Sequence, residues 1–294
     1  MKRFLIYFGC VTLSTIILAF LCDRVNLYLV HHSTGNFIFK MERLWQKHKV
    51  LTVDDDEIPI LGSSRALGNF VPSELSPKCF NYGVNGMGLN EVLFNLKALE
   101  GVESASPIIL NFDPWSNLTE SEGNWVGDYR LSPRSGRSEI LDTIPGIRFY
   151  GMFRKNLTDF FNSKKAVTKV VDKGAVLLKT SRNDKEWTII NSKLTSWSFD
   201  YKAWVEKFEQ QIKALSPRMV LVVVCPCSSR KTELFDSRNN LESFLSRIDN
   251  LSNVTVVNYY GSDKFSDADF VDPTHFNIEG AKKFSRLLKK EIGF

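Results

Sequence analysis

Four short apolar runs do most to limit the folds that are open to this 294-residue chain. They lie at residues 58–61, 108–112, 219–225 and 254–259. The third contains Val-Leu-Val-Val-Val, without the alternation of apolar and polar side chains that marks a strand with one wet face. Continuous apolar runs of this length are typical of parallel strands that are covered on both faces. The sequence therefore predicts a buried, mostly parallel sheet.

Helical patterns lie between and after these runs. They cover residues 90–99, 201–215, 238–248 and 278–292, with Asn277 as the expected N-cap of the last helix. Residues 79–82 add a short fifth strand. Strands that alternate with helices form right-handed βαβ units in an open sheet. Ligands of such sheets bind at the carboxyl ends of the strands, which is where we expect the site.

Residues 114–200 are an exception, because they lack a clear strand pattern. The segment is too long for a plain connection, so we predict an inserted helical or irregular cap. It holds four of the six tryptophans. Two uses of these side chains are open, namely stacking on sugar rings and covering the core of the sheet. They are Trp115, Trp125, Trp187 and Trp197.

The N-terminus carries an uncharged run of nineteen residues at positions 4–22, which is the length of a membrane-spanning helix. Lys2 and Arg3 precede it, and this charge bias predicts a cytoplasmic N-terminus with the remainder exported. A cleaved signal peptide is the alternative, but Ala-Phe-Leu at 19–21 is a poor cleavage site. We therefore predict an uncleaved transmembrane anchor at residues 1–22.

Residues 23–57 are predicted to connect this anchor to a main domain at residues 58–294. Part of the connector has the spacing of an amphipathic helix. Its apolar face would either lie on the membrane or pack on the domain. The residues of this face are Phe37, Met41, Leu44, Trp45 and His48.

The composition excludes several classes of site. A formal net charge of +5 is mild for this length, and no dense basic cluster with interleaved aromatic residues occurs, so nucleic acid is not an expected partner. Cys79, Cys225 and Cys227 form neither a disulfide framework nor a zinc motif, and we expect them as small buried residues at strand ends. No dinucleotide fingerprint or Walker loop is present, so no cofactor and no metal are predicted.

His275 is the only histidine after His48, so imidazole chemistry in the main domain must use it. Asp272, three residues earlier, can reach Nδ1 of that ring, fix its tautomer and stabilise its protonated form. Ser64 follows the first strand, and a serine on a sharp turn there completes a set of nucleophile, base and orienting acid. These three residues predict a serine acyl-transfer or ester-cleaving site. Ser63 is the alternative nucleophile.

Several motifs resemble those of the SGNH/GDSL hydrolase superfamily, over residues 58–115 and 218–294. Gly-Ser-Ser-Arg at 62–65 is similar to the first block, with Ser63 where Asp often stands and Ser64 as the nucleophile. Asn-Tyr-Gly-Val-Asn-Gly at 81–86 resembles the second block, which gives Gly86 the role of an oxyanion-hole N–H donor. Asp-Pro-Thr-His at 272–275 matches the fifth block. The resemblance implies a flavodoxin-like three-layer α/β/α sandwich.

The third block departs from the family's Gly-x-Asn-Asp, whose Asn completes the oxyanion hole. Here the chain reads Asn-Phe-Asp-Pro-Trp at 111–115, so either Asn111 or Asp113 stands at that position. An ionised Asp113 there would oppose the developing oxyanion, and Asp113→Asn would then speed ester hydrolysis about tenfold for each 1.4 kcal/mol recovered. Asp113, Trp115 and Arg65 are candidate substrate-binding residues. For Arg65, a surface ion pair is the other open interpretation.

The opening block, the third-block departure and the anchor are similar to a membrane-anchored branch that acts in O-acetylation of exported polysaccharides and D-alanylation of teichoic acids. The resemblance implies an extracytoplasmic serine O-acyltransferase or esterase that acts on cell-envelope glycopolymers. Its expected partners are a polysaccharide or teichoic-acid-like polymer and a multi-spanning membrane acyltransferase. Two alternatives stay open: a plain carbohydrate or lipid esterase, and a non-catalytic glycan-binding or assembly subunit that keeps the fold.

The predicted topology can be tested by fusion. A reporter enzyme that is active only after export, fused after Phe294, is expected to be active because Lys2 and Arg3 hold the N-terminus in the cytoplasm. An inactive fusion, with a cytoplasmic reporter working in its place, would contradict the topology.

Overall fold

The fold was analysed in a computed structural model. It describes residues 1–31, 40, 43–44, 56–85, 87–100, 104–113, 169–178, 202–228 and 238–294. The chain divides into two compact units. One comprises Met1–Glu42 and Ser121–Ala166, and the other Arg43–Glu120 and Val167–Phe294. Each is described by itself.

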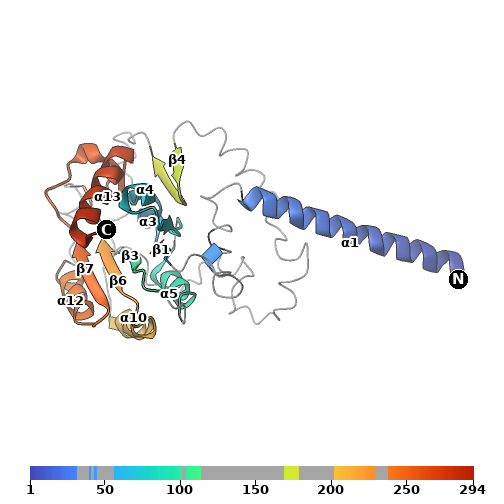
Figure 1. Ribbon diagram of the computed structural model, residues 1–294, viewed down its shortest axis with the longest axis horizontal. Helices are drawn as coiled ribbons and strands as arrows, with labels where there is room; N and C mark the ends of the chain where they lie inside the picture. The colour runs from blue at the N-terminus through green and yellow to red at the C-terminus, as the bar shows by residue number, and fades with distance from the viewer. Residues whose placement is uncertain are drawn as a thin grey trace. The chain divides into compact units, whose positions relative to one another are not determined.

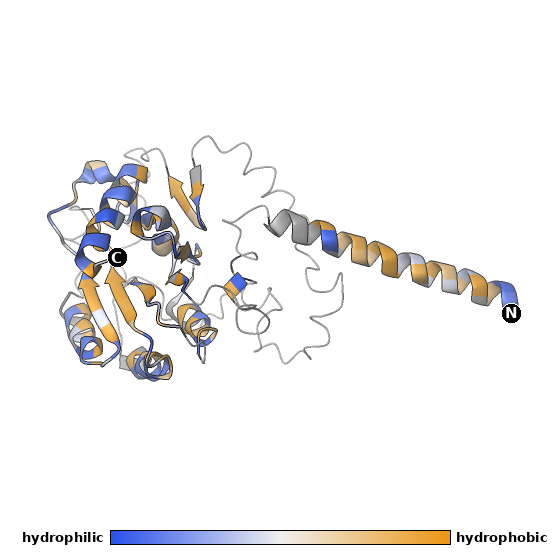
Figure 2. Ribbon diagram, viewed as in Figure 1, coloured by the Kyte–Doolittle hydropathy of each residue, from blue (hydrophilic) through white to orange (hydrophobic). Residues whose placement is uncertain are grey.

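Among the described residues of the first unit, Lys2–His31 form one long helix, α1. Large apolar side chains are exposed along it, with Phe4 at 69% and Phe8 at 62%, and Figure 2 shows the helix to be hydrophobic over most of its length. Its span Lys2–Cys22 is long and apolar enough to cross a membrane, with a mean hydropathy of 2.3. The helix runs past the predicted boundary at residue 22, and its topology stays a prediction.

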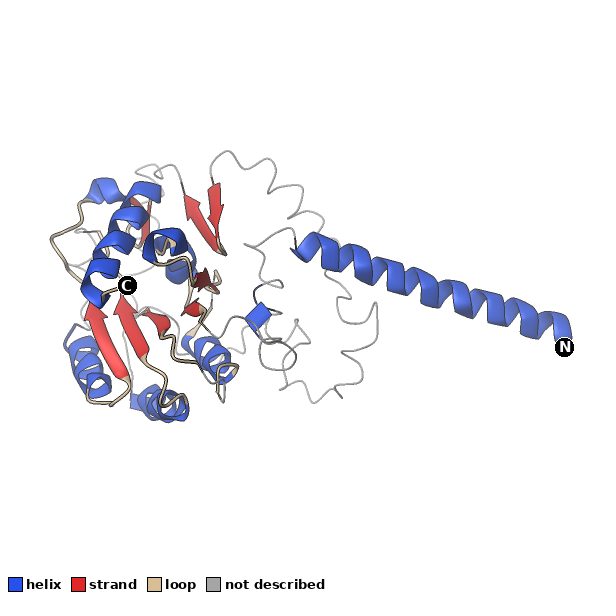
Figure 3. Cartoon of the chain, in the orientation of Figure 1, coloured by secondary structure: helices blue, strands red, loops and turns tan. Residues whose placement is uncertain are grey.

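The second unit is built on a five-stranded sheet in which every neighbouring pair is parallel. Figure 3 draws the strands in red and the helices in blue, and the strand order is β2-β1-β3-β6-β7. This confirms the predicted mostly parallel sheet, and the predicted bounds of all five strands hold to within a residue. The strands are β1 (Ile58–Leu61), β2 (Cys79–Asn81), β3 (Ile108–Phe112), β6 (Val220–Val224) and β7 (Val254–Asn258).

One face of the sheet packs against α3 (Ser64–Asn69), α4 (Pro72–Leu75) and α13 (Ile278–Ile292). Aromatic rings fill this layer, and the Phe284 ring lies edge-on to Phe70 with centroids 5.2 Å apart. The opposite layer holds α5 (Leu89–Lys97), α10 (Lys202–Ala214) and α12 (Arg238–Asp249), grouped together in Figure 1. There the Phe112 ring stacks on Phe244 at 4.6 Å. Helices therefore cover both faces, which explains the unbroken apolar runs.

Helix α13 begins and ends where its sequence dictates. The Asn277 side chain accepts hydrogen bonds from the backbone N–H groups of Glu279 and Gly280, at 3.1 and 2.9 Å, so the predicted N-cap is confirmed. Gly293 ends the helix with φ +76°, a left-handed conformation that glycine adopts without strain. The N-cap therefore fixes the start of α13 shortly after His275 in the sequence.

The predicted helical or irregular character of residues 114–200 is wrong for one part of the segment. Residues 169–178 form an antiparallel hairpin of β4 (Lys169–Asp172) and β5 (Ala175–Leu178). Its two-residue loop has positive φ at Lys173 (+40°) and Gly174 (+89°), the pattern of the turns that suit the twist of hairpins. The missed signal was this Lys-Gly pair between two short apolar runs.

The hairpin packs against the start of the main sheet. The Lys173 carbonyl accepts from the Asn81 N–H at 2.9 Å, beside the edge strand β2. Asp172 accepts from both the backbone N–H and the hydroxyl of Ser73, at 3.0 and 2.8 Å. Pairing of this kind covers part of a sheet edge that would otherwise present unpaired backbone groups.

Several sequence-based predictions fall outside the described residues. These include the four tryptophans of the 114–200 segment and most of the predicted amphipathic connector face. Of that face, the structure describes Leu44, which is helical and fully buried.

Two glycines with left-handed backbones test how the hairpin is seated. A Cβ on Gly174 would lie 2.2 Å from the Asn81 carbonyl oxygen, whereas a Cβ on Gly293 would meet nothing within 4 Å. Gly293→Ala should cost about 1 kcal/mol for its backbone conformation. Gly174→Ala should cost about 1–3 kcal/mol more, from the overlap. Urea unfolding of the detergent-solubilised protein measures both, and equal losses would show that the hairpin does not rest on β2.

Candidate active site

Ser64 stands at a sharp turn from strand to helix at the carboxyl end of β1. Gly62 makes this turn with φ +142°, and a Cβ there would come within 2.9 Å of Ala66 and Asn111. Only glycine fits such a position without a shift of its neighbours. Ser63 then caps α3, its hydroxyl accepting from the Arg65 N–H at 3.3 Å. The turn brings Ser64 to the first position of the helix.

His275, the predicted base, comes from near the C-terminal end of the sequence. Two short strands, β8 (Phe270–Asp272) and β9 (His275–Phe276), pair across the Asp-Pro-Thr-His turn. The Asp272 carboxylate accepts from the backbone N–H groups of Thr274 and His275, both at 3.0 Å, and from the Thr274 hydroxyl at 3.1 Å. It is also within 2.9 Å of His275 Nδ1. The local turn therefore builds the pair of carboxylate and imidazole without help from distant residues.

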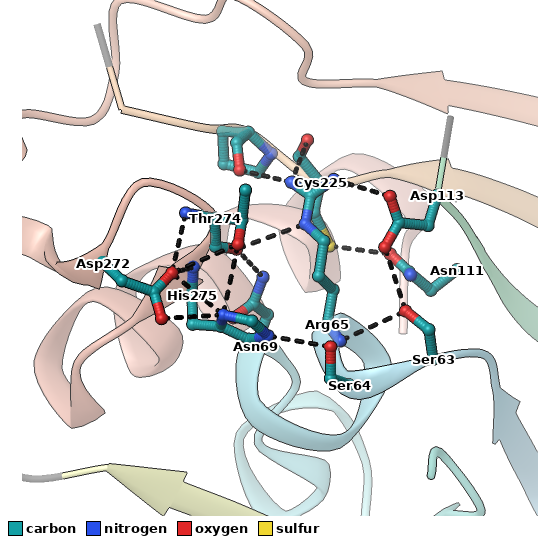
Figure 4. Close-up of polar contacts among 11 residues, drawn as sticks. Ser63, Ser64, Arg65, Asn69, Asn111, Asp113, Cys225, Asp272, Thr274 and His275 are labelled. Atoms are coloured by element: carbon teal, nitrogen blue, oxygen red, sulfur yellow. Dashed lines mark hydrogen bonds and ion pairs between the residues drawn. The ribbon is translucent and has the colours of Figure 1, made fainter. Parts of the chain in front are cut away.

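The three predicted triad residues meet in the structure (Figure 4). His275 Nε2 lies 2.9 Å from Ser64 Oγ, while its Nδ1 faces Asp272, whose side chain is 1% exposed. A carboxylate can only accept, so Nδ1 carries the proton and Nε2 is left to accept from the serine hydroxyl. The His275 side chain is 23% exposed, which leaves the imidazole open to solvent on one side. The arrangement can take a proton from Ser64 as its oxygen attacks.

The Arg65 side chain is buried within the domain, and its predicted role in substrate binding stays a prediction. Its side chain is 1% exposed, so a surface ion pair is excluded. The guanidinium instead donates to three backbone carbonyls, those of Thr274 at 3.2 Å, Cys225 at 2.8 Å and Pro226 at 2.6 Å. Its described contacts are with the protein itself, and they tie the Ser64 turn to the loop that carries His275.

Asp113 follows β3 and is buried beside the start of α3. Its Oδ2 accepts from the Ser63 hydroxyl at 3.0 Å, and its Oδ1 lies 3.8 Å from Nη1 of Arg65. The carboxylate thus faces a buried cation and a hydroxyl. Its described partners are those of a residue that anchors α3, and its proposed effect on an oxyanion stays a prediction.

Of the remaining predicted site residues, Asn111 is among those that the structure describes. Asn111 lies within β3 and is buried, and its side-chain oxygen accepts from the Cys225 thiol at 2.9 Å. Its side-chain N–H₂ is buried and has no hydrogen-bond partner among the described residues. Gly86 and Trp115 lie outside the described residues. The composition of the oxyanion hole is therefore a prediction.

Three of the five cysteines are buried, as predicted. Cys79, Cys225 and Cys227 lie in the interior and form no disulfide, whereas Cys10 and Cys22 on α1 are exposed. Burial raises the pKa of the Cys225 thiol to about 12, so it is not a thiolate nucleophile at neutral pH. Within the described parts of the chain, no group of three or more His, Cys, Asp or Glu side chains is placed to hold a metal ion.

Sequence reasoning missed the residues that surround His275 and the start of α3. Asn69 contacts the backbone on both sides of His275. Gly83 lets the chain after β2 approach α3, since a Cβ there would lie 2.5 Å from the Leu67 nitrogen. Gly83 falls inside the motif at 81–86, so the sequence did mark it. Nothing in the sequence marks Asn69, because its partners are more than 200 residues away.

Comparisons with known proteins add little to this geometry. No protein-family model matches the chain, and no curated protein matches it. Among solved structures, a protein from Streptococcus pneumoniae provisionally described as a platelet activating factor is similar, at 14% identity with a TM-score of 0.38. The similarity covers 87% of this chain and 94% of that chain. A likeness so remote carries no argument about activity.

The two accounts of Asp113 predict opposite results for Asp113→Asn. From its contacts, we expect no faster ester hydrolysis and a loss of about 1–3 kcal/mol in the free energy of unfolding, because Arg65 loses its counter-charge. Ser63→Ala is a control that keeps the carboxylate, because it removes only the hydroxyl that contacts Asp113 and the Arg65 N–H. Hydrolysis of a chromogenic acetyl ester and urea unfolding measure the two effects. Faster hydrolysis by a fully stable Asp113→Asn variant would restore the view that this charge opposes the oxyanion.

Proposed function

We propose that this protein is a serine-dependent O-acyltransferase or esterase that acts on cell-envelope glycopolymers outside the cytoplasmic membrane. The observation that carries the proposal is the hydrogen-bonded series from Ser64 Oγ through the His275 ring to Asp272, with successive distances of 2.9 and 2.9 Å. Such a series activates a hydroxyl whose own acidity is too weak for attack at neutral pH. A serine, an imidazole and a buried carboxylate in this order suit acyl transfer.

In the first half of the reaction, Ser64 Oγ bonds to the acyl carbonyl carbon as His275 Nε2 takes its proton. Asp272 stabilises the imidazolium that forms. The carbonyl oxygen becomes an anion, for which the backbone N–H groups of Ser64 and Gly86 and the amide of Asn111 are the proposed donors. His275 then returns the proton to the leaving alcohol, which departs and leaves an ester on Ser64.

In the second half, an acceptor hydroxyl replaces the departed alcohol. His275 takes its proton, the acceptor oxygen attacks the acyl carbon, and the bond to Ser64 breaks as the serine regains a proton. When water is the acceptor the outcome is hydrolysis, and when a sugar hydroxyl is the acceptor the outcome is transfer. The chemistry of the two is the same, so the choice depends on which acceptor reaches the acyl-enzyme.

Three features support the proposed assignment to acyl transfer at the cell envelope. The parallel strands have the chain order 2-1-3-4-5, which is that of the flavodoxin-like class. Ser64 and His275 stand where the resemblance to the SGNH/GDSL superfamily places a nucleophile and a base. The apolar helix α1 could hold the domain at a membrane surface, next to membrane-borne acyl donors and a multi-spanning acyltransferase. That location favours transfer over free hydrolysis.

Ser64→Ala tests the proposal against a non-catalytic binding subunit. The variant should lose at least about a thousandfold in hydrolysis of a chromogenic acetyl ester and should no longer be labelled by a fluorophosphonate. His275→Ala should lose activity to a similar extent, with little change in melting temperature because its ring is partly exposed. Ser63→Ala is the matched control, and it should still be labelled. A wild-type protein that neither hydrolyses the ester nor takes the label would favour the binding subunit.

A further inference from the structure

The short helix α3 carries the proposed nucleophile and also contacts the backbone on both sides of the proposed base. Ser64 is its first residue, and two other side chains of the same helix hold the backbone around His275. The Thr274 carbonyl accepts from Asn69 Nδ2 and from Arg65 Nε, each at 3.2 Å. On the other side of the histidine, the Phe276 N–H donates to Asn69 Oδ1 at 3.0 Å. Figure 4 shows Asn69 beside His275, and Arg65 between Thr274 and Asp113.

We propose that Arg65 and Asn69 are positioning residues that set the distance between Ser64 and His275. The proposal rests on the proposed function. The two reacting groups are 211 residues apart in sequence, so neither local turn can fix the 2.9 Å contact between them. Because one helix carries the nucleophile and also holds the residues before and after the base, a shift of the helix moves both together.

Arg65 extends this hold to a third segment. Its Nη2 also donates to the carbonyls of Cys225 and Pro226, directly after β6. Hydrogen bonds from a cation are stronger than those from a neutral donor, and the planar guanidinium fixes their directions. The start of α3, the end of β6 and the β8–β9 turn are thereby joined at one side chain. Asp113, 3.8 Å away, supplies the opposite charge that a buried cation needs.

The helix also comes close to the imidazole ring itself. A Cβ built on Gly68 would lie 3.9 Å from Cδ2 of His275, which is ordinary contact distance. The ring therefore has the helix on one side and the Asp272 carboxylate on another. With its flanking backbone held by Asn69 and its Nδ1 held by Asp272, His275 has little freedom to move away from Ser64. Reacting groups held in this way gain rate, and a misplacement of about 1 Å can cost about 100-fold.

The domain offers matched controls for both side chains. Arg218 is 6% exposed and donates to the carbonyls of Ser106 at 2.7 Å and Glu57 at 3.3 Å. Asn253 is 5% exposed and donates to the carbonyls of Ile212 at 3.0 Å and Arg218 at 3.2 Å. Each is buried and donates to backbone carbonyls, as its counterpart in α3 does. Neither contacts a residue of the proposed triad, so each reports the structural cost alone.

The first experiment compares Asn69→Ala with Asn253→Ala in the full-length protein, using the chromogenic acetyl ester. Both variants should melt at a lower temperature than the wild type, by similar amounts. Asn69→Ala should lower kcat by about 10- to 100-fold with KM changed less than about twofold. Asn253→Ala should leave both constants near their wild-type values. Arg65→Lys, which keeps the charge but loses the fork, should behave like Asn69→Ala, and Arg218→Lys like Asn253→Ala.

A double-mutant cycle decides whether the loss acts through the base. In a His275→Ala background, Asn69→Ala should change the residual rate less than about twofold, because no imidazole remains to be positioned. An undiminished kcat for folded Asn69→Ala and Arg65→Lys would overturn the proposal, and so would a full loss that persists without His275. If Ser64→Ala is as active as the wild type, it is the proposed function that fails, which is a separate result.

Discussion

The burial of the Arg65 guanidinium is the constraint around which the candidate site is arranged. A charged group leaves water only where hydrogen bonds and an opposite charge replace its hydration. The carbonyls of Thr274, Cys225 and Pro226 provide the hydrogen bonds, and Asp113 provides the charge. These acceptors follow different strands at the same edge of the domain. The guanidinium therefore requires those strand ends to converge on the start of α3, which is also where Ser64 stands.

The same edge explains why such donors are needed. Parallel strands that end together leave backbone carbonyls without partners, and buried carbonyls must find donors elsewhere. Long side chains with several N–H groups, such as Arg65 and Asn69, meet this need from the adjacent helix. The pair of Asp272 and His275 is different, because its turn supplies its own backbone donors. The site thus combines two kinds of contact. The pair of Asp272 and His275 is determined by its local turn, whereas the contacts of Arg65 and Asn69 form only when distant strands are packed together.

This difference decides how much could be predicted from the sequence. The strands of the main sheet could be predicted because residues such as those of β6 are apolar on both faces. The contact between Asp272 and His275 could be predicted because the two residues are three positions apart. Helix α3 is too short to show a periodic pattern, and the hairpin depends on a Lys-Gly turn that is weaker than Asn-Gly. The burial of Arg65 was not predictable, since its acceptors are carbonyls up to 209 residues away and carry no side-chain signal.

The contacts of Asp113 show how the charge of Arg65 is balanced at the start of α3. Ser63 and Asp113 are 50 residues apart in sequence, but their side chains share a hydrogen bond of 3.0 Å, and Asp113 also faces Arg65 at 3.8 Å. A buried arginine needs one nearby negative charge, whichever strand supplies it. Here the end of β3 supplies that charge, so the turn that carries Ser64 is held to β3 through Asp113 and to the His275 loop through Arg65. The position of Ser64 relative to His275 therefore depends on a charge pair that neither residue belongs to.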